Sequence, residues 1–170
     1  MPMDEASHDV MDRETSLGEN AKLQLHVWLR MLTCTQLIER RIRAGLRKSF
    51  NTTLPRFDAL SQIEAAGGVL SMGELSGRLM VTSGNVTGLI DSMEKDGLVI
   101  REPHPEDRRS ILIQMTAKGD ELFSSMVPWH QKEIDQVMRV LNKRDMRELL
   151  DLLGKLKSSA RTAQSDGRRT

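Results

Sequence analysis

The amino-acid sequence predicts a mainly α-helical protein with one short β-hairpin near its centre. Apolar residues recur every three or four positions over most of the chain, which is the period of a helix that buries one face. Leu and Met are abundant, and Tyr is absent. Two short apolar runs, residues 98–100 and 111–113, flank a loop rich in proline and charge, and this pattern predicts two strands. We therefore expect four helices, two strands and two further helices.

Length and composition exclude several classes of protein. The 170 residues suit one domain with a buried core. No apolar run approaches the roughly 20 residues that a membrane-spanning helix needs, so no membrane partner is expected. Residues 1–19 are acidic and lack an apolar stretch, which predicts a disordered arm and not a secretory signal. Cys34 is the only cysteine and excludes an internal disulfide, which fits a reducing cytoplasm.

The first predicted helix occupies residues 20–50 and carries an apolar stripe too long for one chain to cover. We expect part of this stripe to face a second subunit. The stripe is formed by Leu23, Val27, Met31, Cys34, Ile38 and Ile42.

The central part, residues 51–116, has the signals of a compact lobe. Pro55 suits the first turn of a helix that Gly67 and Gly68 end. Ser71 and Glu74 have the spacing of a capping box, which starts a short helix. Thr82 or Ser83 caps the next helix, whose buried face is predicted to be Val86, Leu89, Ile90 and Met93. Two short helices followed by a hairpin predict a winged helix-turn-helix.

Residues 117–160 predict two more helices with apolar faces. Thr116 caps the first, Pro128 should kink it, and Asn142 with Asp145 opens the second. These helices are also expected to take part in dimerisation, and residues 161–170 to form a disordered tail.

Three segments resemble the MarR family of bacterial transcriptional regulators, over roughly residues 23–156. Residues 81–91, VTSGNVTGLID, are similar to the family pattern V-T-x-x-x-V-T-x-L-I/V-D. Residues 94–98, EKDGL, resemble its L-E-x-x-G-L turn, with Met93 in place of Leu. Residues 107–109, DRR, followed by MTAKG at 115–119, resemble the wing signature D-x-R and then L-T-x-x-G.

The resemblance implies a homodimer in which the terminal helices of two subunits interlock. Each subunit would place its recognition helix in the major groove of a pseudo-palindromic double-stranded DNA operator and its wing in the adjacent minor groove. Ligand sites in the family lie between the dimerisation helices and the DNA-binding lobe. The family habit is repression of a nearby operon.

The residues themselves suggest which side chains contact DNA. Small and hydroxylated side chains on the recognition helix allow close approach to base edges, and asparagine can bond adenine. Arginine suits a narrow minor groove. Asp107 is expected to position a wing arginine by an ion pair. The alternative is that these residues only cap, turn and solvate the chain. The predicted DNA contacts are Ser83, Gly84, Asn85, Thr87, Arg108 and Arg109.

Residues 37–57 hold six cations against one acid, Glu39, although the net charge of the whole chain is only +1. Three readings stay open: a solvated face with ion pairs, contact with backbone phosphates, or a site for an anionic effector such as an aromatic carboxylate or an acyl-CoA. The predicted effector residues are Trp28, Met31, Arg40, Arg43, Arg47 and Phe57.

Other chemistries have less support. Cys34 on the helix stripe is expected to pack as a small apolar residue, with a redox-sensing repressor as the alternative. The four histidines show no metal-chelating spacing. We find no nucleophile–base arrangement and no phosphate-binding glycine loop, so neither an enzyme nor a cofactor is expected. A winged helix used for protein contact is a further alternative, which the recognition-helix residues and the wing arginines oppose.

Overall fold

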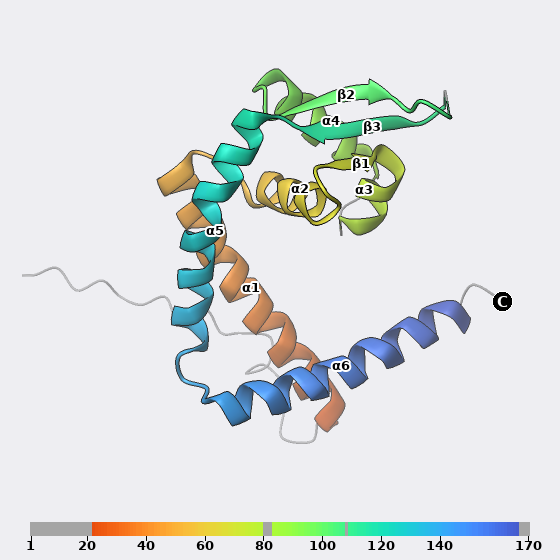
Figure 1. The fold of residues 1–170 in the computed structure, drawn as a ribbon. Helices are drawn as coiled ribbons and strands as arrows, with labels where there is room; N and C mark the ends of the chain where they lie inside the picture. The colour runs from red at the N-terminus through yellow and green to blue at the C-terminus, as the bar shows by residue number, and fades with distance from the viewer. Residues whose placement is uncertain (1–21, 80–82, 108, 167–170) are drawn as a thin grey trace, which may run out of the picture. The chain divides into compact units, whose positions relative to one another are not determined.

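The computed structural model describes residues 22–79, 83–107 and 109–166. The predicted N-terminal arm, the connection at residues 80–82 and Arg108 lie outside the described residues. The chain divides into two compact units, Met1–His130 and Gln131–Thr170. The elements in chain order are α1 (Leu23–Phe50), α2 (Leu54–Ala65), β1 (Val69–Ser71), α3 (Met72–Arg78), α4 (Ser83–Lys95), β2 (Val99–Pro103), β3 (Ile111–Met115), α5 (Ala117–Met138) and α6 (Lys143–Asp166) (Figure 1).

The sheet has three antiparallel strands in the order β1-β3-β2. The predicted hairpin is confirmed, because β2 pairs with β3 from Val99 opposite Met115 to Pro103 opposite Ile111. The strand β1 was not predicted. It has only three residues, and it exists because Leu70 lies opposite Ile113 on the free side of β3. Pairing between distant segments, and not a local pattern, defines it.

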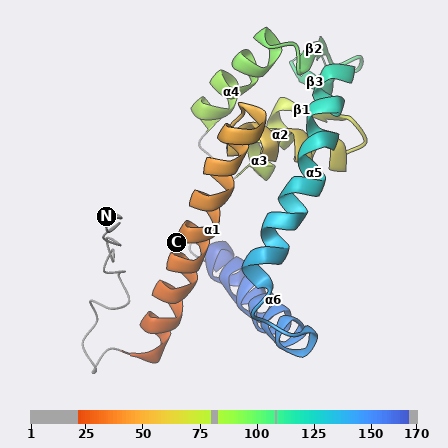
Figure 2. The same cartoon turned by 90° about the vertical axis from the view of Figure 1, so that its left-hand side faces the viewer.

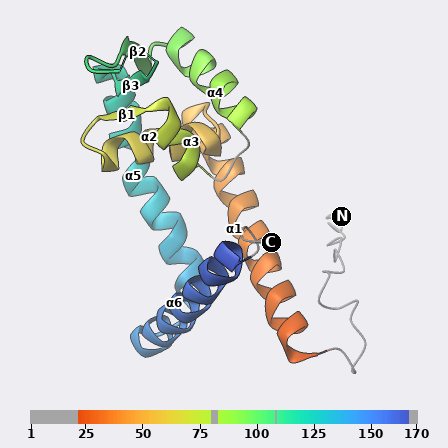
Figure 3. The ribbon, with the colours of Figure 1, turned by 90° about the vertical axis from the view of Figure 1, so that its right-hand side faces the viewer.

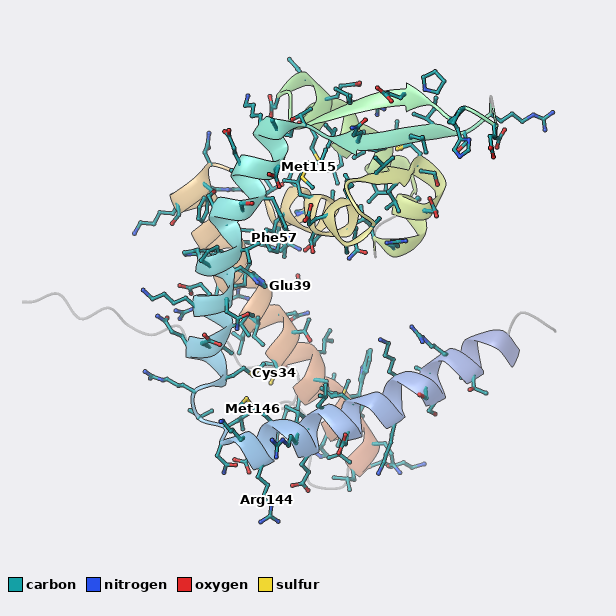
Figure 4. The ribbon with its side chains drawn as sticks, viewed as in Figure 1. Cys34, Glu39, Phe57, Met115, Arg144 and Met146 are labelled. Atoms are coloured by element: carbon teal, nitrogen blue, oxygen red, sulfur yellow. The ribbon has the colours of Figure 1, made fainter. Side chains whose placement is uncertain are left out.

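The core of the first unit lies between α2, α3, α4 and the sheet. Two aromatic contacts extend it to α5, where the Phe57 ring lies 5.7 Å from Phe123 and 4.8 Å from His130, centroid to centroid. Figure 4 shows Phe57 next to α5. Burial lowers the pKa of His130, so the neutral imidazole is favoured there. The fully buried large side chains are Leu46, Leu60, Ile63, Leu75, Val86, Ile90, Met93, Val99, Ile113 and Met126.

Local capping residues set several helix starts, as the sequence predicts. The Ser71 Oγ accepts the Glu74 N–H, and the Glu74 carboxylate accepts the Ser71 N–H. These bonds also lower the pKa of Glu74. The Asn142 Oδ1 accepts the N–H of Asp145, whose carboxylate accepts the Asn142 N–H. The last helix continues to Asp166, beyond the predicted end at residue 160.

The second unit consists of the end of α5 and α6, and α6 exposes a row of leucines. Leu150 is 71% exposed and Leu152 is 55% exposed. In the first unit, α1 leaves Leu23 and Trp28 exposed at 75% and 57%. Helix faces this apolar normally lie against another surface. None of the described helices is long and apolar enough to cross a membrane.

The start of α5 lies directly against the backbone at the entrance to the wing. The Thr116 Oγ1 donates to the carbonyl oxygen of Gly97 at 2.7 Å and accepts the N–H of Gly119 at 3.0 Å. Gly119 is buried, and a Cβ there would overlap the carbonyl oxygen of Leu98 and lie 3.0 Å from Met115 Cγ. The glycine of the segment MTAKG is therefore required by close packing.

We expect Gly119→Ala to lower the free energy of unfolding by about 1–3 kcal/mol, because the added methyl forces the α5 backbone away from Leu98. Urea denaturation measures the loss. Gly77→Ala in α3 is the matched control, since its Cβ meets nothing within 4 Å. Equal stability of the two variants would contradict the close-packing argument.

Candidate nucleic-acid interface

Helix α4 has one face in the core and an opposite face in solvent. Val86, Ile90 and Met93 are fully buried. Leu89 is only half-buried, although it was predicted to lie with them. Thr87, Gly88 and Asp91 are exposed on the other side. Figure 2 shows α4 at the margin of the first unit.

The predicted DNA contacts on α4 fall in its first turn and a half. Ser83, Gly84 and Asn85 belong to the helix, but their side chains lie outside the described part of the structure. The Thr87 side chain is exposed, and a Cβ added at Gly88 would meet nothing within 4 Å. The described part of this face is therefore small and open.

The wing tip is organised by side chains that accept backbone hydrogen bonds. The Asp107 Oδ1 accepts the N–H of Arg109 at 3.0 Å, so Asp107 shapes the loop that carries the arginine. The His104 Nδ1 accepts the N–H groups of Glu106 and Asp107 at 3.2 Å each. Arg109 itself is exposed, as a groove-binding side chain needs to be. Arg108 is outside the described residues.

Arg101 was not among the predicted site residues, and it connects β2 of the wing to α4 through ion pairs. Its guanidinium lies 2.6 Å from Asp91 Oδ1 and 2.7 Å from Glu94 Oε2. It also donates to the carbonyl oxygen of Thr87 at 3.4 Å. The Arg101 side chain is 25% exposed, whereas the side chains of Asp91 and Glu94 are 60% and 40% exposed, so solvent screens the pairs from the carboxylate side. The residues that follow Gly97 carry no local signal for this contact.

A second arginine ties α2 to the end of α4. Arg56 lies 2.6 Å from Asp96 Oδ2, and it donates to the Ser92 hydroxyl. Its side chain is 18% exposed. Arg101 and Arg56 thus hold the same helix from two sides, one from the sheet and one from α2.

Three of the arginines of α1, Arg40, Arg43 and Arg47, line surface cavities. Arg43 and Arg47 line one cavity, and Arg40 lines a neighbouring one with Arg43. Arg43 also pairs with Glu39 at 3.0 Å on the same helix. Burial raises the pKa of Asp58, the Glu39 charge adds to this, and Arg43 opposes it.

The apolar members of the predicted effector set are not gathered with these arginines. Phe57 is buried against α5, Trp28 is exposed, and Met31 is half-buried on α1. None of the three lines the arginine cavities.

The prediction that Cys34 packs as a small apolar residue is wrong within the single chain. Cys34 is exposed on α1, where Figure 4 labels it. The reason is that the helical period identifies a stripe but not the surface that covers it. The described residues contain no group of three His, Cys, Asp or Glu side chains suited to a metal ion.

We expect Arg101→Met to lower the free energy of unfolding by about 0.5–2 kcal/mol, since the partly exposed carboxylates of Asp91 and Glu94 lose their shared partner. Urea denaturation and amide hydrogen exchange measure this, with faster exchange in β2 and β3. Arg56→Met is the control, because it removes the tie to α2 and should leave exchange in the hairpin unchanged. Unchanged hairpin exchange in Arg101→Met would refute the role given to Arg101.

Comparison with known proteins gives relatives of one kind. Residues 52–111 match the MarR family. The HTH-type transcriptional regulator YkoM of Bacillus subtilis is 32% identical over 117 residues, 69% of this chain and 74% of the relative. The transcriptional repressor YetL of the same organism is 36% identical over 51% of this chain and 52% of the relative. The transcriptional activatory protein BadR of Rhodopseudomonas palustris is 35% identical over 64% of each chain.

Solved structures show the same fold. The MarR family regulator AbsC of Streptomyces coelicolor has a TM-score of 0.76 at 22% identity and covers 86% of this chain and 99% of its own. Sco3205 of the same organism, solved with DNA, has a TM-score of 0.73 at 20% identity over 84% and 92%. The organohalide-sensing regulator RdhR-CbdbA1625, with 2,4-dichlorophenol bound, has a TM-score of 0.74 at 24% identity over 83% of each chain. Regulators of this kind are not enzymes, and the chain belongs to the MarR family of DNA-binding transcriptional regulators.

Proposed function

We propose that the protein is a homodimeric repressor that binds a pseudo-palindromic operator and is released by a small anionic effector. DNA binding is the part of this proposal that the arrangement of α4 and the wing supports. An open face of small residues lies on a helix that Arg101 connects to a hairpin with an exposed arginine at its tip. A helix enters the major groove only if its outer face is free, and a wing reaches the next groove only if its position is fixed.

Dimerisation is supported by the apolar surface of the terminal helices. Large apolar side chains are exposed along both α1 and α6, beyond what an isolated chain normally leaves in water. A second copy of the chain would cover them. The two recognition helices of such a dimer would meet half-sites about one helical turn apart.

Repression is supported by YetL, which is a repressor, whereas BadR is an activatory protein. Effector release is supported by charge and by RdhR-CbdbA1625, which binds a chlorinated phenol. The six predicted effector residues include Arg40, Arg43 and Arg47, which lie on one helix and could attract an aromatic acid or the phosphates of an acyl-CoA. The proposed protein is a cytoplasmic repressor. Oxidation of Cys34 is the second candidate signal, because this cysteine is exposed.

Arg109→Ala should weaken binding to the operator by about tenfold, because the wing loses a cation in the minor groove. Fluorescence anisotropy at fixed salt measures the affinity, and analytical ultracentrifugation checks that the oligomeric state is unchanged. Arg144→Ala on α6 removes the same charge elsewhere and serves as the control. Equal affinities for the two variants would remove the wing from the proposed interface.

The repressor proposal predicts tight binding to the intergenic DNA upstream of its own gene and release by one compound among aromatic acids and their CoA thioesters. A gel-shift titration with this panel is the measurement. Release by peroxide, absent in Cys34→Ser, would replace the effector with oxidation. Absence of binding to that DNA even at low salt would contradict the assigned target.

A further inference from the structure

The loop that joins β2 to β3 turns around one side chain, that of His104. The His104 Nδ1 accepts the N–H groups of Glu106 and Asp107, each at 3.2 Å. The His104 N–H donates to the Ser110 carbonyl oxygen at 3.0 Å, so the same residue also closes the base of the loop. His104 is half-buried, whereas Glu106 and Asp107 are exposed. The imidazole is therefore the acceptor that organises the described part of this loop.

Arg109 is connected to the imidazole through Asp107. The Asp107 N–H donates to His104, and the Asp107 Oδ1 accepts the N–H of Arg109 at 3.0 Å. The Asp107 carbonyl oxygen accepts the N–H of Ser110 at 2.9 Å. The backbone that carries Arg109 is thus held by two acceptors of Asp107, and the position of Asp107 depends on His104.

The imidazole accepts these N–H groups only while it is uncharged. A neutral histidine has one ring nitrogen that accepts, whereas both nitrogens of the imidazolium are donors. Because Nδ1 is the acceptor here, the neutral His104 carries its proton on Nε2. A second proton would go onto Nδ1, which faces the two N–H groups, and both hydrogen bonds would be lost. Histidine is the side chain that ordinarily changes its charge between pH 5 and pH 8.

Carboxylates from two elements lie near His104. The capping hydrogen bonds of Glu74, in the first turn of α3, lower its pKa most, and the charge of His104 adds to this lowering. Figure 3 shows α3 and β1 below the hairpin of β2 and β3. The charged residues of the loop itself that the structure describes are Glu106, Asp107 and Arg109. A carboxylate attracts an imidazolium but cannot restore the lost acceptor, because an imidazolium has none.

On the basis of the proposed contact between Arg109 and DNA, we propose that His104 is a positioning residue whose neutral imidazole holds the wing tip for the minor groove. Acidification then has two opposite effects on DNA binding. An added cation strengthens binding to phosphates, whereas a loosened loop has to be ordered again on the DNA at a cost in affinity. The loss of order is the larger effect, because the neighbouring carboxylates offset the new charge. DNA binding is therefore weaker in acid.

The first experiment follows the wing without DNA. Amide NMR of the full chain between about pH 5.5 and pH 8 records the resonances of Glu106, Asp107 and Arg109. All three are expected to shift together as the His104 imidazole is protonated. His104→Asn should abolish this shift, because the Asn Oδ1 is bonded to Cγ as Nδ1 is, accepts hydrogen bonds and does not titrate. The proposal is overturned if the three amides titrate in His104→Asn as they do in the wild type.

The second experiment measures affinity for the upstream intergenic DNA by fluorescence anisotropy at about pH 7.5 and pH 5.5, at fixed salt. The wild type is expected to bind about three- to tenfold more weakly at the lower pH, the loss expected from one or two hydrogen bonds. His104→Asn should lose this response. His104→Leu, with the same branching and no acceptor, should bind weakly at both pH values. His26→Asn on α1 is the matched control and should respond as the wild type does.

The combined results separate this positioning role from the proposed function. If the His104 variants bind DNA like the wild type at both pH values while Arg109→Ala binds more weakly, the positioning role is wrong and the wing stays in the interface. If Arg109→Ala also binds like the wild type, the wing contact itself fails, and the positioning role fails with it. Tighter binding of the wild type in acid, absent in His104→Asn, would make His104 a phosphate contact and would also overturn the proposal.

Discussion

The contact between the start of α5 and the turn at Gly97–Leu98 is the constraint on which the arrangement of α4, β2 and β3 depends. Gly97 adopts a positive φ of 73° and ends α4, so the chain can turn directly into β2. Thr116 then bonds back to Gly97, and the absence of a side chain at Gly119 lets α5 lie on the backbone of Leu98. The end of the recognition helix, both wing strands and the start of α5 are therefore fixed at one point.

Side-chain ion pairs extend this arrangement away from that point. Arg101 connects β2 to two turns of α4, and Arg56 connects α2 to its last turn. Both arginines are largely covered, whereas their carboxylate partners are 40–60% exposed and stay solvated, so the arginine side of each pair is the part held by the fold. Recognition of a groove needs the helix and the wing in a fixed register, and these pairs supply it with charges that are not themselves offered to DNA.

The arginines of α1 differ from Arg56 and Arg101 in being exposed, and Arg43 pairs with an acid of its own helix. Arg43 and Arg47 line a cavity at the junction of α1 and α2, together with Thr52, Thr53 and the first two residues of α2. Because Leu89 of the recognition helix completes the lining, any group bound there touches α4 directly.

The sequence by itself determined the features that depend on neighbours along the chain. The capping boxes at Ser71 and Asn142, the Thr116 cap and the hairpin are set by residues a few positions apart, and all were predictable. The tertiary structure alone decided the strand β1, the partners of Arg101 and the separation of Phe57 from the α1 arginines. Each of these depends on segments distant in sequence meeting in space. Helical periodicity shows which residues share a face, but only packing decides what that face meets.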